Sequence, residues 1–147
     1  MLQGPCPGMS WPQLATWVPA FLAQTKGALD IADYHSYNQI KPHPPRVLYL
    51  NKTFPEADLR QQHGPTAGGQ GWQAVAQQGY AEAANLPVWL GEGADHNGGG
   101  GGTFARTFVN SHYFISALGT LLEVGHSVFA RQTLVGGNYE VRGVPSS

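Results

Sequence analysis

The chain has 147 residues, of which 12% are charged, and its formal net charge at pH 7 is -1. This length allows one modest hydrophobic core but is too short for a complete (β/α)8 barrel, which needs roughly 200 residues or more. The weak net charge gives no global field that would attract nucleic acid or an anionic membrane surface. No stretch approaches the roughly 18 to 20 consecutive apolar residues of a membrane span. The single cysteine, Cys6, excludes a disulfide within the chain.

The first predicted helix lies near the N-terminus. Residues 1–10 are rich in Gly and Pro and are expected to form a loop. Apolar side chains with helical spacing follow at Leu14, Trp17, Val18, Phe21 and Leu22. Pro12 suits the first turn of this helix and Gly27 its end, and Pro19 predicts a kink or an early stop.

The next segment changes to a period of two. It predicts a strand at 28–37, whose one face carries Leu29, Ile31, Asp33, His35 and Tyr37. Residues 38–71 are expected to be long and irregular, although 47–50 have the composition of a short strand. A second helix is predicted at 72–84, with Trp72, Val75, Ala76 and Tyr80 grouped on one side.

A second strand is predicted at 87–92. It is apolar on both faces, as a parallel strand covered on both sides should be, and it ends at Glu92. The glycine run 98–102 follows. These glycines allow a ligand to approach backbone N–H groups closely, although a flexible linker has the same composition.

The last predicted elements are a helix and a strand. The helix is expected to begin near Thr103 and to stop at Gly119, with Phe104, Phe108, Ile115 and Leu118 in the core. The strand is expected at 127–134, before a turn at 136–139. Helices therefore alternate with strands along the chain. This order predicts an α/β fold with about three β/α units and parallel strands.

The residues that could take part in chemistry lie where these strands end. The carboxyl ends of parallel strands meet at one rim, so Asp33, His35 and Glu92 should lie together. Glu92 is the leading candidate for catalysis, and the alternatives are a solvated rim residue or a carboxylate that pairs with a helix. His35 either positions a carboxylate or is a structural histidine. Asp33, His35, Glu92 and His96 could also be metal ligands, but no HxH or HExxH spacing supports a metal.

Other residues are expected near the same rim. Arg131 and Gln132 should point to opposite faces of the last strand, and Tyr139 could stack on a sugar. His126 begins that strand and so should lie at its amino end, opposite to this rim. No Ser or Cys nucleophile motif, P-loop or dinucleotide-binding pattern is present, so no cofactor is expected.

Three segments together resemble the heparanase-like glycoside hydrolases of family 79. They are Asp33-Tyr34-His35-Ser36-Tyr37-Asn38, Val88-Trp89-Leu90-Gly91-Glu92 with its glycines, and 131–139, which begins Arg131-Gln132 and ends Gly137-Asn138-Tyr139. The resemblance implies a retaining β-glucuronidase on a (β/α)8 barrel, of which residues 1–147 would be the C-terminal part. It implies that Glu92 is the nucleophile and His35 a supporting residue. The residues implied to contact the glucuronic acid unit are Gln132, Gly137, Tyr139, Gly98 and Gly99.

One departure from this family is large. A retaining hydrolase needs a second carboxyl group roughly 5 Å from the nucleophile, to act as acid and then base. The family carries it in an Asn-Glu-Pro segment, and this chain has no Asn-Glu pair. Asp33 and Asp95 are the nearest substitutes. The early strands and a C-terminal β-sandwich are expected to be absent, so the chain alone should be inactive without the missing barrel half.

The resemblance also bears on partners and location. It implies a glucuronide-containing glycan or proteoglycan as substrate and a secreted, lysosomal or membrane-associated protein, while the weak net charge indicates no nucleic-acid partner. The expected rim offers few cations beyond Lys41, Arg106 and Arg131, so a less charged glucuronide fits at least as well as a highly sulfated chain. The alternative is a non-catalytic remnant that binds a glycan or a protein.

Overall fold

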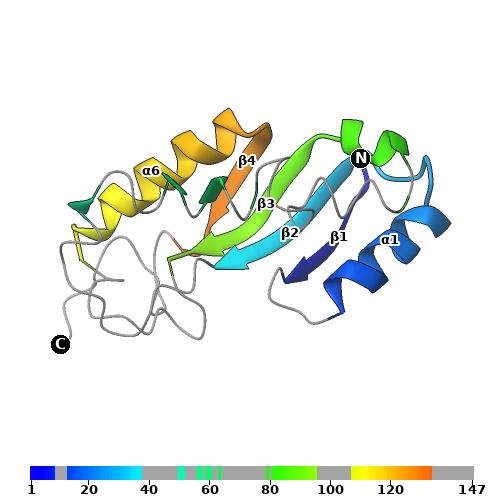
Figure 1. Cartoon of the computed structure of the whole chain (residues 1–147), viewed down its shortest axis with the longest axis horizontal. Helices are drawn as coiled ribbons and strands as arrows, with labels where there is room; N and C mark the ends of the chain where they lie inside the picture. Colours follow the sequence, from blue (N-terminus) through cyan, green and yellow to red (C-terminus); the bar gives the residue numbers. More distant parts are fainter. Residues whose placement is uncertain are drawn as a thin grey trace.

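A computed structural model of the chain describes residues 1–8, 13–37, 50–51, 56–57, 59–60, 63, 79, 81–95 and 107–133. Its centre is one parallel sheet in the order β1-β2-β3-β4 (Figure 1), made of β1 (Gln3–Gly8), β2 (Ile31–Tyr37), β3 (Val88–Ala94) and β4 (His126–Arg131). The predicted α/β class with parallel strands is confirmed. The arrangement is consistent with a segment of a (β/α)8 barrel.

β1 corrects the loop predicted at 1–10. Its prolines and glycines suppress the usual strand signal, yet the segment pairs in parallel with β2. The Leu2 carbonyl accepts backbone hydrogen bonds from Asp30 and Ile31, so the polar backbone groups of Leu2 face β2. These groups point to alternate edges along a strand, so those of Pro5 face the edge of β1 away from β2. No described strand pairs with that edge. The missing N–H of Pro5 therefore costs no hydrogen bond within the described sheet.

α1 (Leu14–Gln24) forms as predicted and packs against the sheet. Its buried residues are Leu14, Val18 and Leu22, which join Ala32, Tyr34 and Leu90 in one core cluster. Of the kink or early stop predicted at Pro19, the early stop is wrong, because the helix continues to Gln24. Pro19 removes the N–H that would bond to the carbonyl of Ala15, and Ala15 is exposed, so water can satisfy that carbonyl.

α6 (Asn110–Glu123) buries a different face from the predicted one. Its buried residues are Asn110, Tyr113, Ala117, Thr120 and Leu121. Phe108 is 84% exposed and Ile115 is 67% exposed, so the prediction that they are core residues is wrong. Two stripes of this segment have helical spacing, and the small Ala117 lies on the one that packs against Leu59 and Phe129.

Gly119 also differs from its prediction. It lies inside α6 rather than at its end. Gly125, with a φ of 95°, lies between α6 and β4 and supplies the left-handed conformation there. Leu118, placed in the core by the same prediction, is partly buried.

Several predicted elements fall wholly or partly outside the described residues. Phe104 lies there, as does most of the helix predicted at 72–84, whose end forms the short 3-10 helix η1 (Ala81–Asn85). Leu50 is helical, and the rest of the possible strand at 47–50 is not described. None of the helices within the described residues is long and apolar enough to cross a membrane.

Gly93 offers a test of this packing. A Cβ atom at Gly93 would lie 2.9 Å from the Ser36 carbonyl oxygen and 2.7 Å from Leu90 Cδ2. Gly93→Ala should therefore lower the free energy of unfolding by about 1 to 3 kcal/mol, measured by urea denaturation. Gly119→Ala is the matched control, because a Cβ there meets nothing within 4 Å and Ala favours a helix interior by roughly 0.5 to 1 kcal/mol. Equal effects of the two variants would contradict this packing.

Candidate active site

A β-bulge in β3 determines where the Glu92 side chain lies. Tyr34 pairs with Leu90, but the next residue of β2, His35, pairs with Glu92, so Gly91 is the extra residue. A Cβ at Gly91 would lie 2.8 Å from Asp33 Oδ2, so Gly91 faces Asp33. In a regular strand, Gly91 and Glu92 would point to opposite faces of the sheet. The bulge instead places both on the face that carries Asp33.

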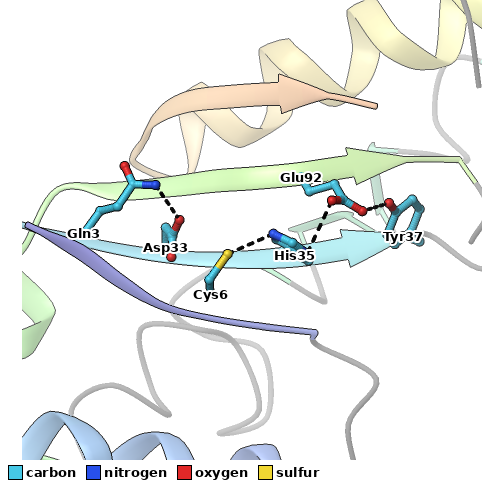
Figure 2. Close-up of polar contacts among 6 residues, drawn as sticks. All are labelled: Gln3, Cys6, Asp33, His35, Tyr37 and Glu92. Atoms are coloured by element: carbon cyan, nitrogen blue, oxygen red, sulfur yellow. Dashed lines mark hydrogen bonds and ion pairs between the residues drawn. The ribbon is translucent and has the colours of Figure 1, made fainter. Parts of the chain in front are cut away.

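Glu92 contacts two side chains of β2 at the carboxyl end of the sheet (Figure 2). The Tyr37 hydroxyl donates a hydrogen bond to Glu92 Oε1. His35 Nδ1 lies 3.7 Å from Glu92 Oε2. The side chains of His35 and Glu92 are each 30% exposed. The structure thus brings Glu92 and His35 together as the sequence predicts, and both remain accessible to a ligand.

The same face continues onto β1. Cys6 Sγ lies 2.9 Å from His35 Nε2, so His35 stands between Cys6 and Glu92. The pKa of Cys6 is raised to about 11, first by partial burial, then by the charge of Asp33 and a hydrogen bond to Asp33, and last by the charge of Glu92. Cys6 therefore stays a protonated thiol near neutral pH and is a poor nucleophile. Glu92 is the stronger nucleophile candidate.

The two possible substitutes for the missing acid/base are both buried. Asp33 is 1% exposed, and its Oδ2 accepts a hydrogen bond of 3.2 Å from Gln3 Nε2. Asp95 is also 1% exposed, and its Oδ1 accepts from Asn110 Nδ2 of α6 at 3.4 Å. Neither carboxylate is presented to a substrate in this arrangement.

Arg131 and Gln132 occupy different environments at the end of β4. The Arg131 guanidinium lies 5.3 Å from the centre of the Phe114 ring of α6, so it packs on the helix side of the sheet. Burial lowers the pKa of Arg131 from its usual value. The backbone N–H of Gln132 donates a 3.0 Å hydrogen bond to the carbonyl of Gly93, which places Gln132 beside the residue that follows Glu92.

The remaining candidates from the sequence stay predictions. Gly98, Gly99, Gly137, Tyr139 and the possible metal ligand His96 lie outside the described residues. Among the described residues, no three of His, Cys, Asp and Glu are placed to hold a metal ion. His126 is the first residue of β4, at the end opposite to Glu92, as predicted.

Sequence reasoning missed three members of this site. Tyr37 lies on the predicted face of β2 but was not assigned a role, although its alternation with His35 could have suggested one. Cys6 and Gln3 were placed in a loop, so no signal connected them to His35 and Asp33.

Comparison with known proteins gives a limited likeness. No protein-family model matches the sequence. The chain is 28% identical over 124 residues to heparanase-like protein 2 of Arabidopsis thaliana, covering 77% of this chain and 20% of that protein. It is 28% identical over 122 residues to heparanase-like protein 1 of the same plant, covering 76% of this chain and 19% of that protein. The chain thus spans about a fifth of the length of these curated relatives.

Proposed function

We propose that the chain carries the nucleophile part of a retaining glycosidase site that acts on β-glucuronides of glycans or proteoglycans. The observation that carries the proposal is the bulge that aims the partly exposed Glu92 between His35 and Tyr37. The similarity to two heparanase-like proteins supports a glycosidase over other uses of a strand-end carboxylate. Residues 1–147 would then be part of a larger (β/α)8 domain of the family 79 type.

The geometry suggests how Glu92 would act. Tyr37 holds Oε1, which leaves Oε2, on the His35 side, to attack the anomeric carbon. The bond from that carbon to the leaving oxygen breaks as the bond to Oε2 forms, which gives a covalent glucuronyl-enzyme. Water would later hydrolyse this ester with retention of configuration. The backbone N–H groups of Gly98, Gly99 and Gly137, with Gln132 and Tyr139, are proposed to hold the glucuronate.

The missing acid/base limits what the chain can do alone, so the inactivity expected from the sequence applies to substrates with unactivated leaving groups. A sugar or alcohol leaving group needs a proton from a second carboxyl group, and Asp33 and Asp95 are buried. An activated leaving group such as dinitrophenolate departs without that proton. Azide, which needs no general base, can then replace water in the second step.

This chemistry provides the test of the proposal. The purified 147-residue chain should convert dinitrophenyl β-glucuronide to β-glucuronyl azide when azide is present, with product configuration determined by NMR. Methyl β-glucuronide, which has a poor leaving group, should give no product. Formation of the α-azide would contradict a retaining mechanism. Absence of any azide product from the folded chain would contradict the proposed function.

The burial of both Asp33 and Asp95 also favours a second candidate, a non-catalytic glycan-binding role. In that case glucuronic acid would shift NMR signals of His35 and Glu92 in a titration, while dinitrophenyl β-glucuronide would give no azide product. The two functions are therefore separated by transfer to azide, not by binding.

A further inference from the structure

Cys6 lies on this face but has no part in the proposed mechanism. Its sulfur lies 2.9 Å from His35 Nε2, while the other ring nitrogen, Nδ1, faces Glu92 Oε2 at 3.7 Å. Figure 2 shows the three side chains in a row that crosses β1, β2 and β3. The contact of Cys6 with Nε2 therefore affects whether Nδ1 directs a hydrogen or a lone pair toward Glu92.

We propose that Cys6 is a positioning residue, whose thiol donates to His35 Nε2 and so keeps the ring in the tautomer that presents Nδ1–H to Glu92. This inference rests on the proposed function of Glu92 and names a residue that supports it. A neutral imidazole has one N–H, so a donor at Nε2 places the ring hydrogen on Nδ1. The Nδ1–H dipole then stabilises the Glu92 carboxylate on the side of Oε2.

The opposite arrangement of the hydrogen bonds is less favourable. The Cys6 thiol also lies near the Asp33 carboxylate, and donation to Asp33 would leave the sulfur to accept Nε2–H from His35. The bare lone pair of Nδ1 would then face the negative charge of Glu92. That contact is repulsive, whereas Nδ1–H facing Glu92 is attractive. Asp33 Oδ2 already accepts from Gln3 Nε2, but its buried Oδ1 has no hydrogen-bond partner among the described residues, so the charge of Glu92 is what favours donation to His35.

The backbone of β1 fits the same role. Cys6 has a φ of 62°, a conformation that non-glycine residues rarely adopt, and it lies within the register shift between β1 and β2. This irregularity sets the side chain of Cys6 against His35 although Gly8, not Cys6, is the register partner of His35. An unusual backbone conformation that brings one side chain into a polar contact is typical of functional sites.

The test reads the tautomer directly. The full chain is labelled with 15N on its histidine rings, and the six histidines are assigned with the help of His35→Gln. The wild-type ring of His35 should show a protonated Nδ1 and an unprotonated Nε2. Cys6→Ser keeps a donor within hydrogen-bond reach and should preserve this pattern, whereas Cys6→Ala should shift it toward Nε2–H. Glu82→Gln, an exposed residue that pairs with Lys26 outside this row of side chains, is the control and should leave the pattern of His35 unchanged.

A kinetic readout connects this tautomer to the proposed chemistry. Cys6→Ala should slow the formation of glucuronyl azide by about three- to tenfold, as the loss of one hydrogen bond predicts, and Cys6→Ser should restore it. A wild-type His35 with Nε2–H, or one protonated on both nitrogens at neutral pH, would overturn the inference. So would an unchanged tautomer in Cys6→Ala. The NMR readout needs no turnover, so a chain with the expected tautomer but no azide product would refute the proposed function alone.

Discussion

Glu92→Gln is expected to abolish covalent labelling of the chain by 2-deoxy-2-fluoro-β-glucuronyl fluoride. Fluoride leaves without a proton, so the labelling step needs the nucleophile but not the missing acid/base. The 2-fluoro group slows the second step, and the glucuronyl-enzyme accumulates. The amide of glutamine occupies nearly the same space but has no negative charge with which to attack. The wild-type chain should therefore gain the mass of one fluoroglucuronyl group, and the variant should gain none.

A matched control separates this loss from general damage. Glu123→Gln also removes one carboxylate, but Glu123 is an exposed residue that pairs with Arg60 at 2.6 Å, away from the carboxyl end of the sheet. This variant should label as the wild type does. Peptide mapping should place the adduct on Glu92. Labelling that persists in Glu92→Gln, or an adduct on Cys6, would refute the nucleophile assignment.

The strands that present the site could be predicted because their patterns are strong. The period of two at Ile31–Tyr37 and the apolar run at Val88–Ala94 each indicate a buried strand, and parallel pairing places their ends together. What the pattern could not predict is the bulge at Gly91. A one-residue shift in pairing leaves no periodic signal. Yet this shift decides that Glu92 lies on the same face of the sheet as His35.

Other features escaped prediction because local propensity and periodicity were misleading or ambiguous. Gly and Pro at 3–8 indicate a loop, but pairing with β2 forms a strand there. Two stripes of α6 fit a helix, and tertiary packing buries the one with Ala117 rather than the one with Ile115. Cys6 entered the site through the unexpected strand. Its contact with His35 could therefore not be predicted from the spacing of residues.

A second polar cluster, on the helix side of the sheet, controls the expected response to acid. The Tyr34 hydroxyl lies 2.6 Å from both His63 Nδ1 and His126 Nε2, and all three side chains are buried. One hydroxyl can donate to one ring and accept from the other, which suits two neutral histidines. Burial, with the nearby His126, lowers the pKa of His63 to about 3. Burial lowers that of His126 to about 4, against a smaller opposing effect of the Leu121 backbone.

These lowered pKa values predict that the fold loses stability as the pH falls below about 6.5, the usual value for histidine in an unfolded chain. Between there and the folded values of about 3 and 4, the unfolded chain binds two protons that the folded chain does not. Stability therefore rises with pH in this window. From pH 7 to pH 5, the two histidines together should lower the free energy of unfolding by about 3 to 4 kcal/mol. Urea denaturation at a series of pH values measures this change.

The slope of stability against pH identifies which residues are responsible. His63→Gln removes one of the two buried titrating rings, so it should reduce the contribution of the cluster to the slope by about half, whatever it does to stability at pH 7. His112 is exposed on α6, and His112→Gln should leave the slope as in the wild type. Since acid also protonates carboxylates, the difference in slope between the two variants is the decisive quantity. Equal slopes for His63→Gln and His112→Gln would show that the buried rings do not remain neutral in the folded chain.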